Sequence, residues 1–179
     1  MPLNLVIPIL VSAATVAVFV LLLRRIAALL AISRDAEVFR RRIVALGQEL
    51  DRTLGTILPQ VDALRRGTQE AATMAEALDA ALAALVRLAE ECRVLRWPAG
   101  TDAARIAFAA EIERADRGLQ VIEHGTVILA SGPEGPRLAE AHTSVKRGYL
   151  NVLHAQESLA RQAVEIATAH TTVSGSIIR

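Results

Sequence analysis

The sequence contains few of the residues that support disulfide frameworks, nucleic-acid binding or common catalytic motifs. Its 179 residues include one cysteine, Cys92, which excludes an internal disulfide. Aromatic residues make up 3% of the chain, whereas a nucleic-acid footprint needs aromatic side chains set among basic ones on one face. The sequence also lacks a glycine-rich phosphate loop and a nucleophile elbow. We therefore expect no nucleic-acid partner and find none of the usual catalytic motifs.

Histidine and cysteine chemistry is also poorly supported. The four histidines are His124, His142, His154 and His170. None belongs to an HxxxH pair, and only His124 and His142 would approach each other, across a turn. Two ligands are fewer than the three or four protein ligands that zinc takes. Cys92 lies on an apolar helix face, which favours a small buried residue over a catalytic thiol. We expect no metal, no cofactor and no enzymatic activity, since an enzyme would need residues from another chain.

What the chain has in abundance is aliphatic side chains and arginine. Hydrophobic residues make up 53% of it, and they are mostly Ala, Leu, Val and Ile. This composition favours helices over sheets, and we predict an all-α fold. The net charge of +1 hides an asymmetry, because residues 24–66 contain nine arginines and five acids, while residues 67–179 contain eleven basic and fourteen acidic residues. The excess positive charge directly follows the N-terminal apolar run.

Residues 3–23 carry no charged side chain and form the longest apolar run. At about 1.5 Å per residue they span roughly 30 Å, the thickness of a bilayer core, which predicts a single transmembrane helix. A cleaved signal peptide would need a basic n-region, a shorter apolar core and a small-residue cleavage site. Arginines follow the run, so the positive-inside rule places the N-terminus outside the cell membrane and the remainder in the cytoplasm.

Five arginines are candidates for contact with lipid headgroups. Arg24 and Arg25 follow the predicted span directly, where an anionic headgroup stabilises a basic residue by about 1 kcal/mol. The triplet Arg40, Arg41 and Arg42 lies some 25 Å further along a straight helix, where lipid contact and a solvated helix face are both open interpretations. Trp97 would cap a loop far from the bilayer.

The rest of the chain shows apolar residues at alternating spacings of three and four, typical of helices that pack like coiled coils. The first such face keeps its phase from Phe39 through Gly67 to Cys92, which predicts one long helix over about residues 35–97. Gly67 could instead stop the helix, with Thr68 as a new N-cap. Turn residues then separate two more helices, 101–130 and 137–168, and residues 169–179 are expected to form a flexible tail.

The two turns set a register between the predicted helices. If the chain reverses at each turn, Cys92 lies opposite Phe108 across the first, and Ile122 lies opposite Val145 across the second. Short connections favour antiparallel neighbours. We therefore predict an antiparallel three-helix bundle over residues 67–168, carried on a juxtamembrane helical stalk of residues 24–66. A four-helix bundle, in which the chain folds back at Gly67, is the alternative.

A resemblance to a known family lies in residues 57–61, Ile-Leu-Pro-Gln-Val. They resemble an Ile-Pro-Asn-Leu-Val-like motif of the LemA family, bacterial proteins of similar length with an N-terminal membrane helix and a helical bundle. The chain departs from the family at Thr56, where an Asp is usual, and lacks the juxtamembrane Tyr-Asn pair. Tyr149 and Asn151 only approximate the pairs of the last helix. The resemblance implies a membrane-anchored bundle and no particular biochemical role.

Two functions fit these features. The first is a membrane-anchored helical scaffold that binds a protein partner or itself at the cytoplasmic face, because the chain has an anchor and matched helical faces but no active site. The second is a membrane signalling component, in which the helix after the span transmits a change to the bundle. Replacing the anchor by an unrelated apolar helix distinguishes them, since only signalling depends on the identity of the anchor.

Overall fold

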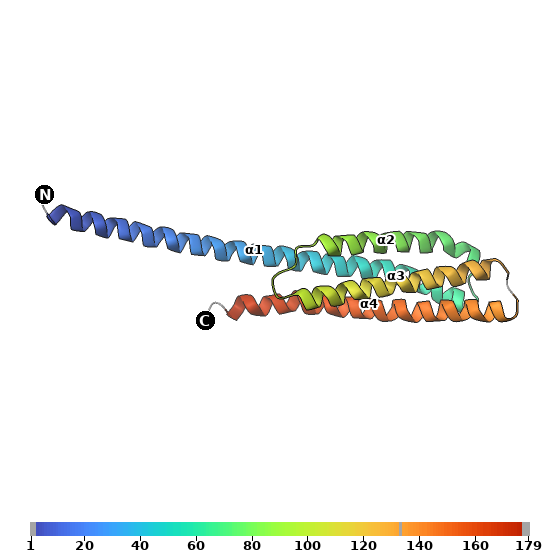
Figure 1. Ribbon diagram of the computed structural model, residues 1–179. Helices are drawn as coiled ribbons and strands as arrows, with labels where there is room; N and C mark the ends of the chain where they lie inside the picture. The colour runs from blue at the N-terminus through green and yellow to red at the C-terminus, as the bar shows by residue number, and fades with distance from the viewer. Residues whose placement is uncertain (1–2, 133, 177–179) are drawn as a thin grey trace. The chain divides into compact units, whose positions relative to one another are not determined.

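The computed structural model describes the backbone of residues 3–132 and 134–176 and the side chains of residues 18–26, 34–132 and 134–169. All regular structure in these residues is helical, which confirms the predicted all-α class. The elements are α1 (Leu3–Arg65), the 3-10 helix η1 (Ala71–Met74), α2 (Ala75–Val94), α3 (Asp102–Ala130) and α4 (Pro136–Ser176) (Figure 1).

The chain divides into two compact units, Met1–Val38 and Phe39–Arg179. The described backbone of the first unit belongs to α1. Among the helical residues whose side chains are described, no stretch is long and apolar enough to cross a membrane. The predicted span of residues 3–23 falls largely outside that set, because the side chains of residues 3–17 are not described.

The second unit contains the later part of α1, contrary to the predicted stalk of residues 24–66. One face of this part is buried in the core at Phe39, Ile43, Leu46, Leu50, Leu54, Ile57, Val61 and Leu64. The side chains on this face had been identified from their spacing, but their partners had not. The chain reverses after them, so the same apolar face packs against helices that follow later in the sequence.

The reversal occurs at Gly67, where the predicted long helix over residues 35–97 is wrong. Gly67 has a φ of 73°, a left-handed conformation that glycine adopts without a Cβ penalty. Its N–H donates to the Leu64 carbonyl at 3.0 Å, and the Thr68 N–H donates to the Ala63 carbonyl at 2.9 Å. This pair of bonds is a Schellman motif, which satisfies carbonyls at the end of a helix. The alternative with a chain reversal at Gly67 therefore matches the structure.

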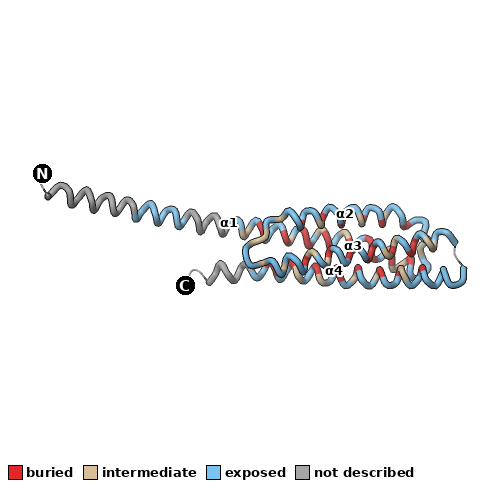
Figure 2. The backbone as a smooth tube through the Cα atoms, viewed as in Figure 1, coloured by how far each residue is buried: buried red, intermediate tan, exposed pale blue. Residues whose placement is uncertain are grey.

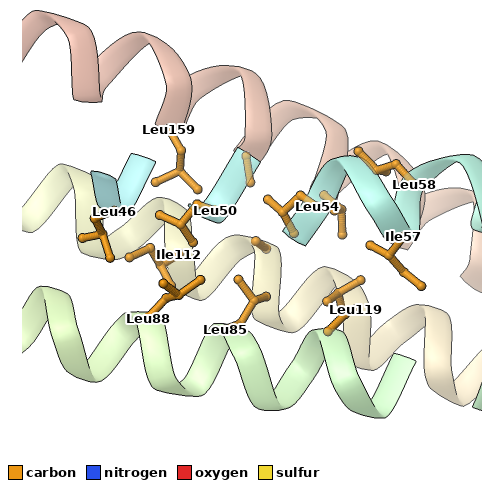
Figure 3. Packing of buried hydrophobic residues seen from close by; sticks show 14 of the residues in the cluster. Leu46, Leu50, Leu54, Ile57, Leu58, Leu85, Leu88, Ile112, Leu119 and Leu159 are labelled. Atoms are coloured by element: carbon orange, nitrogen blue, oxygen red, sulfur yellow. The ribbon is translucent and has the colours of Figure 1, made fainter. Parts of the chain in front are cut away.

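The second unit is an antiparallel bundle of α2, α3, α4 and the later part of α1, with η1 leading into α2 (Figure 1). Buried residues lie on the sides of the four helices that face one another (Figure 2). Leucine and isoleucine side chains from all four helices meet in one continuous core, in which Leu50, Leu88, Ile112 and Leu159 approach one another (Figure 3). The three-and-four spacing predicts Leu50, Ile112 and Leu159 on apolar helix faces but not Leu88.

Helices α3 and α4 approach closely along a line of small residues. A Cβ atom added to Gly148 would lie 2.6 Å from the Gly118 carbonyl oxygen, and one added to Gly125 would lie 2.9 Å from Cγ2 of Val145. Both distances are shorter than van der Waals contact, so only glycine allows this spacing. Val145 and Val152 face α3 at the level that the predicted register gives them.

Two further expectations differ from the structure. Helix α4 continues to Ser176, so the predicted tail from residue 169 is largely helical backbone, and only residues 177–179 lie outside the description. Trp97, expected to cap a distant loop, instead packs on Phe39, with ring centroids 5.3 Å apart. Because α2 returns along α1, the loop after α2 lies beside the start of the bundle unit rather than at its far end.

Candidate functional site

An exposed apolar segment of α1 is the most prominent surface feature of the first unit. Every side chain from Val18 to Leu23 is exposed, by 45% to 63%, and Ile26 is 52% exposed. Six consecutive residues of a helix point in all directions around its axis, so this segment is apolar on every side. A helix of that kind is stable where a bilayer or another protein surrounds it.

The predicted headgroup-contact arginines fall in both units. Arg24 and Arg25 follow the apolar segment and are exposed. Arg40, Arg41 and Arg42 lie in the second unit between the core residues Phe39 and Ile43, and they too are exposed. The structure therefore assigns the triplet to the first turns of the bundle, and contact with lipid stays a prediction for all five.

A groove of about 570 Å3 runs between α2 and α3. Its apolar lining includes Leu85, Ala89, Cys92, Ala109 and Ile112. The arginines on its rim are paired within their own helices, because Arg93 donates to Glu90 at 2.7 Å and Arg105 lies 3.5 Å from Asp102. The groove therefore offers apolar contact, and its arginines are paired with acids of their own helices. Such a lining discriminates little between ligands.

The thiol of Cys92 lies in the lining of this groove and is buried. Burial raises the pKa of the Cys92 thiol, and the nearby positive charge of Arg105 only partly opposes that effect. The thiol is therefore protonated at neutral pH, and a nucleophile needs the thiolate. The location on an apolar seam agrees with the sequence interpretation.

The histidines do not assemble a metal site in the described part of the chain. His124, His142 and His154 are exposed, and no group of three His, Cys, Asp or Glu side chains there could hold a metal ion. His170 lies outside the residues whose side chains are described.

A second groove, of about 490 Å3, lies between α3 and α4, and we call it the basic groove. It is lined by Arg117, Gln120, Val121, His124, Thr143, Ser144 and Arg147. None of these is acidic, although the unit as a whole carries many acids. The sequence pattern does not predict this groove, because Arg117 and Arg147 are 30 positions apart and no motif links them. One feature of the sequence could have indicated the groove. Each arginine directly precedes a glycine, Gly118 or Gly148, at which two helices can approach closely.

Comparisons with protein-family models, with curated proteins and with solved structures found no match to this chain. The LemA-like resemblance accordingly stays an expectation from five residues of sequence.

Proposed function

We propose that this protein is a membrane-anchored scaffold, whose helical bundle binds a protein partner or a second copy of itself at the cytoplasmic face of the cell membrane. The observation that carries the proposal is the apolar segment Val18–Leu23, exposed on every side and followed directly by Arg24 and Arg25. Together with the charge-free run of residues 3–23, it favours a lipid environment over a packed core.

The bundle supports a binding role rather than catalysis. Its core is mostly aliphatic, its cysteine is protonated, and no hydrogen bond joins a nucleophile to a base in either groove among the described residues. The exposed valines and isoleucine on α2 and α3 add apolar contact area for a partner helix, namely Val86, Val94 and Ile106.

The anchor is tested by charge substitution within the apolar run. Ala13→Arg combined with Val16→Arg adds an insertion cost of about 5 to 7 kcal/mol, at about 2.5 to 3.5 kcal/mol for each arginine. We expect wild-type protein to stay in the membrane pellet after alkaline extraction and the double variant to leave it. Val86→Arg combined with Val94→Arg adds the same charge to exposed bundle positions and leaves the protein in the pellet. Wild-type protein in the alkaline supernatant would contradict the anchor.

The scaffold role is tested by purification from native membranes in mild detergent, with mass spectrometry and light scattering of the eluate. A stoichiometric second protein or a homo-oligomer is the expected result, and a lone monomer with nothing bound would contradict it. Because α1 is one helix from Leu3 to Arg65, signalling through it is the second candidate function. Exchange of residues 3–23 for an unrelated apolar helix spares partner binding in a tether and abolishes the response in a signalling protein.

A further inference from the structure

The basic groove brings together donors from two helices that are distant in sequence. On α3 its residues follow the spacing of one helix face, and on α4 they span one turn. Arg117 and Arg147 are the arginines of the groove, and His124 and Ser144 add further donors. The Thr143 hydroxyl instead donates to the Ala139 carbonyl at 2.8 Å.

The close glycine contact explains why the two arginines converge. Arg117 precedes Gly118 and Arg147 precedes Gly148, and these are the glycines whose backbones touch. A Cβ on Gly148 would lie 2.6 Å from the Gly118 carbonyl oxygen, so the two arginine side chains start from backbones that lie very close together. A larger residue at either glycine would push the helices, and with them the arginines, apart.

Neither arginine is strongly neutralised by the protein. Among the described residues Arg147 forms no ion pair. Arg117 pairs with Glu113 of its own helix at 3.6 Å, with both side chains more than 60% exposed, and its charge also acts on the neighbouring Asp116 carboxyl. Such an exposed pair contributes little and opens readily. Like charges placed together raise the electrostatic potential of the groove and attract an anion.

We propose that the basic groove binds a phosphoryl group, carried either by a soluble phosphorylated molecule or by a lipid headgroup. A guanidinium presents its N–H groups as a planar fork that matches phosphate oxygens, and two of them reach the groove from opposite helices. The N–H of His124 and the hydroxyl of Ser144 complete the set of donors. This site is independent of the scaffold role, which rests on the anchor and the bundle surface.

The test is a titration of the full-length protein, in a neutral detergent, with inorganic phosphate, followed by calorimetry against sodium chloride of matched ionic strength. We expect saturable binding of phosphate that chloride does not reproduce. Arg147→Gln weakens that binding by a factor of about ten or more, because a charge-assisted hydrogen bond is lost. Lys146→Gln removes the same charge from the adjacent exposed position outside the groove and changes the affinity by less than about twofold.

Two further measurements make the test decisive. Ser144→Ala removes a neutral donor without changing charge and weakens binding by about two- to tenfold, which replaces Arg147→Gln if that variant fails to fold. No phosphate-specific binding by the wild type, or an equal loss in Arg147→Gln and Lys146→Gln, would overturn the proposal. In detergent micelles that contain phosphatidate, displacement of the bound phosphate supports a lipid source, and retention supports a soluble phosphorylated ligand.

Discussion

The two neighbours of α3 pack against it in different ways. On the α4 side, Gly118, Gly125 and Gly148 let the backbones touch. On the α2 side, large residues such as Leu85 and Leu88 fill the core, and a groove of about 570 Å3 stays open beside them. Small residues therefore set the distance between helices, whereas large ones fill the space that this distance leaves.

The two interfaces therefore depend on different contributions to stability. The glycine contact gains dispersion energy from many close backbone atoms and removes little apolar area from water. The leucine interface gains mainly from burial, at roughly 25 cal/mol per Å2 of apolar area. Removing atoms should thus harm the α2 side most, and adding atoms should harm the α4 side most.

The largest expected effect is the loss of a leucine on the α2 side. Leu88 is fully buried in the core that it shares with Ile112 (Figure 3), and Leu88→Ala should lower the free energy of unfolding by about 3 kcal/mol, through lost burial and the cavity left behind. Val86, two positions away, is 65% exposed, so Val86→Ala should cost less than about 0.5 kcal/mol. Urea unfolding of the full chain in mild detergent, followed by circular dichroism, measures both. Equal losses would mean that α2 is not packed as described.

The second effect comes from adding one methyl group on the α4 side. Gly148→Ala should lower the free energy of unfolding by about 2 kcal/mol, because the new Cβ has no space and the gain in helix propensity only partly offsets the strain. Gly55→Ala is the matched control, since its Cβ would lie 3.5 Å from Nε2 of Gln156, an ordinary contact. There we expect a gain of about 0.4 to 1 kcal/mol. A neutral or stabilising Gly148→Ala would show that α3 and α4 lie further apart.

The smallest effect concerns Asp116, one of the acids that line the open groove. Burial raises the pKa of the Asp116 carboxyl above its ordinary value, and the positive charge of Arg117 opposes this only in part. The folded state therefore binds a proton more readily than the unfolded state, so stability falls as the pH rises through the interval between the unfolded and folded pKa values. Asp116→Asn should be slightly more stable than wild type at neutral pH, by less than about 0.5 kcal/mol, and equal to it in acid.

An NMR titration of the aspartate carboxyls tests this difference directly. In the same spectrum Asp62 is the internal control, because the hydrogen bond from Arg65 lowers the pKa of the Asp62 carboxyl. We expect Asp116 to titrate above Asp62. The reverse order would show that water fills the groove around Asp116 and that its apolar lining has little effect.

The buried helix faces could be predicted from the sequence, because every helix that packs on a core has apolar residues at intervals of three and four on the side that faces it. The spacing predicts one face from Phe108 to Leu129 and another from Leu138 to Ile166. Most of these positions are buried, whereas Leu138 is exposed and Leu129, Tyr149 and Gln156 are half-buried. Hydrophobic spacing identifies the side of a helix that is buried, whatever covers it. The identity of the covering helix is a long-range property that this spacing does not contain.

The first boundary shows this limit most clearly. The apolar phase continues across Gly67 even though the chain reverses there, because both helices of the hairpin face the same core. Gly67 is a possible end of the helix in the sequence. The unbroken spacing of apolar residues instead favours one continuous helix, and that prediction is wrong. The spacing is wrong close to the turn. It predicts Thr68 and Ala75 on the buried face, but both are exposed, and Met74 is buried instead.

The basic groove was out of reach for a similar reason. No motif links Arg117 and Arg147, which line one groove, although the predicted register between the two helices places their positions close together. The sequence instead predicts a site at Arg24, Arg25 and Arg40 to Arg42, because these arginines are clustered along the chain. Residues that are clustered in sequence need not be close in space. Arg117 and Arg147 line one groove because the glycine contact holds their two helices close together.

Trp97 provides an optical probe of one joint in this molecule. It is the only tryptophan, half-buried between Phe39 of α1 and Phe108 of α3, with its indole N–H donated to the Cys92 carbonyl at 3.2 Å. Phe39 is the first residue of the bundle unit. The wavelength of tryptophan emission therefore depends on whether α1 packs against Trp97 at this end of the bundle. It shifts to the red when α1 separates and water reaches the ring. Time-resolved emission can thus follow the seating of α1 separately from the melting of the helices, without an added label.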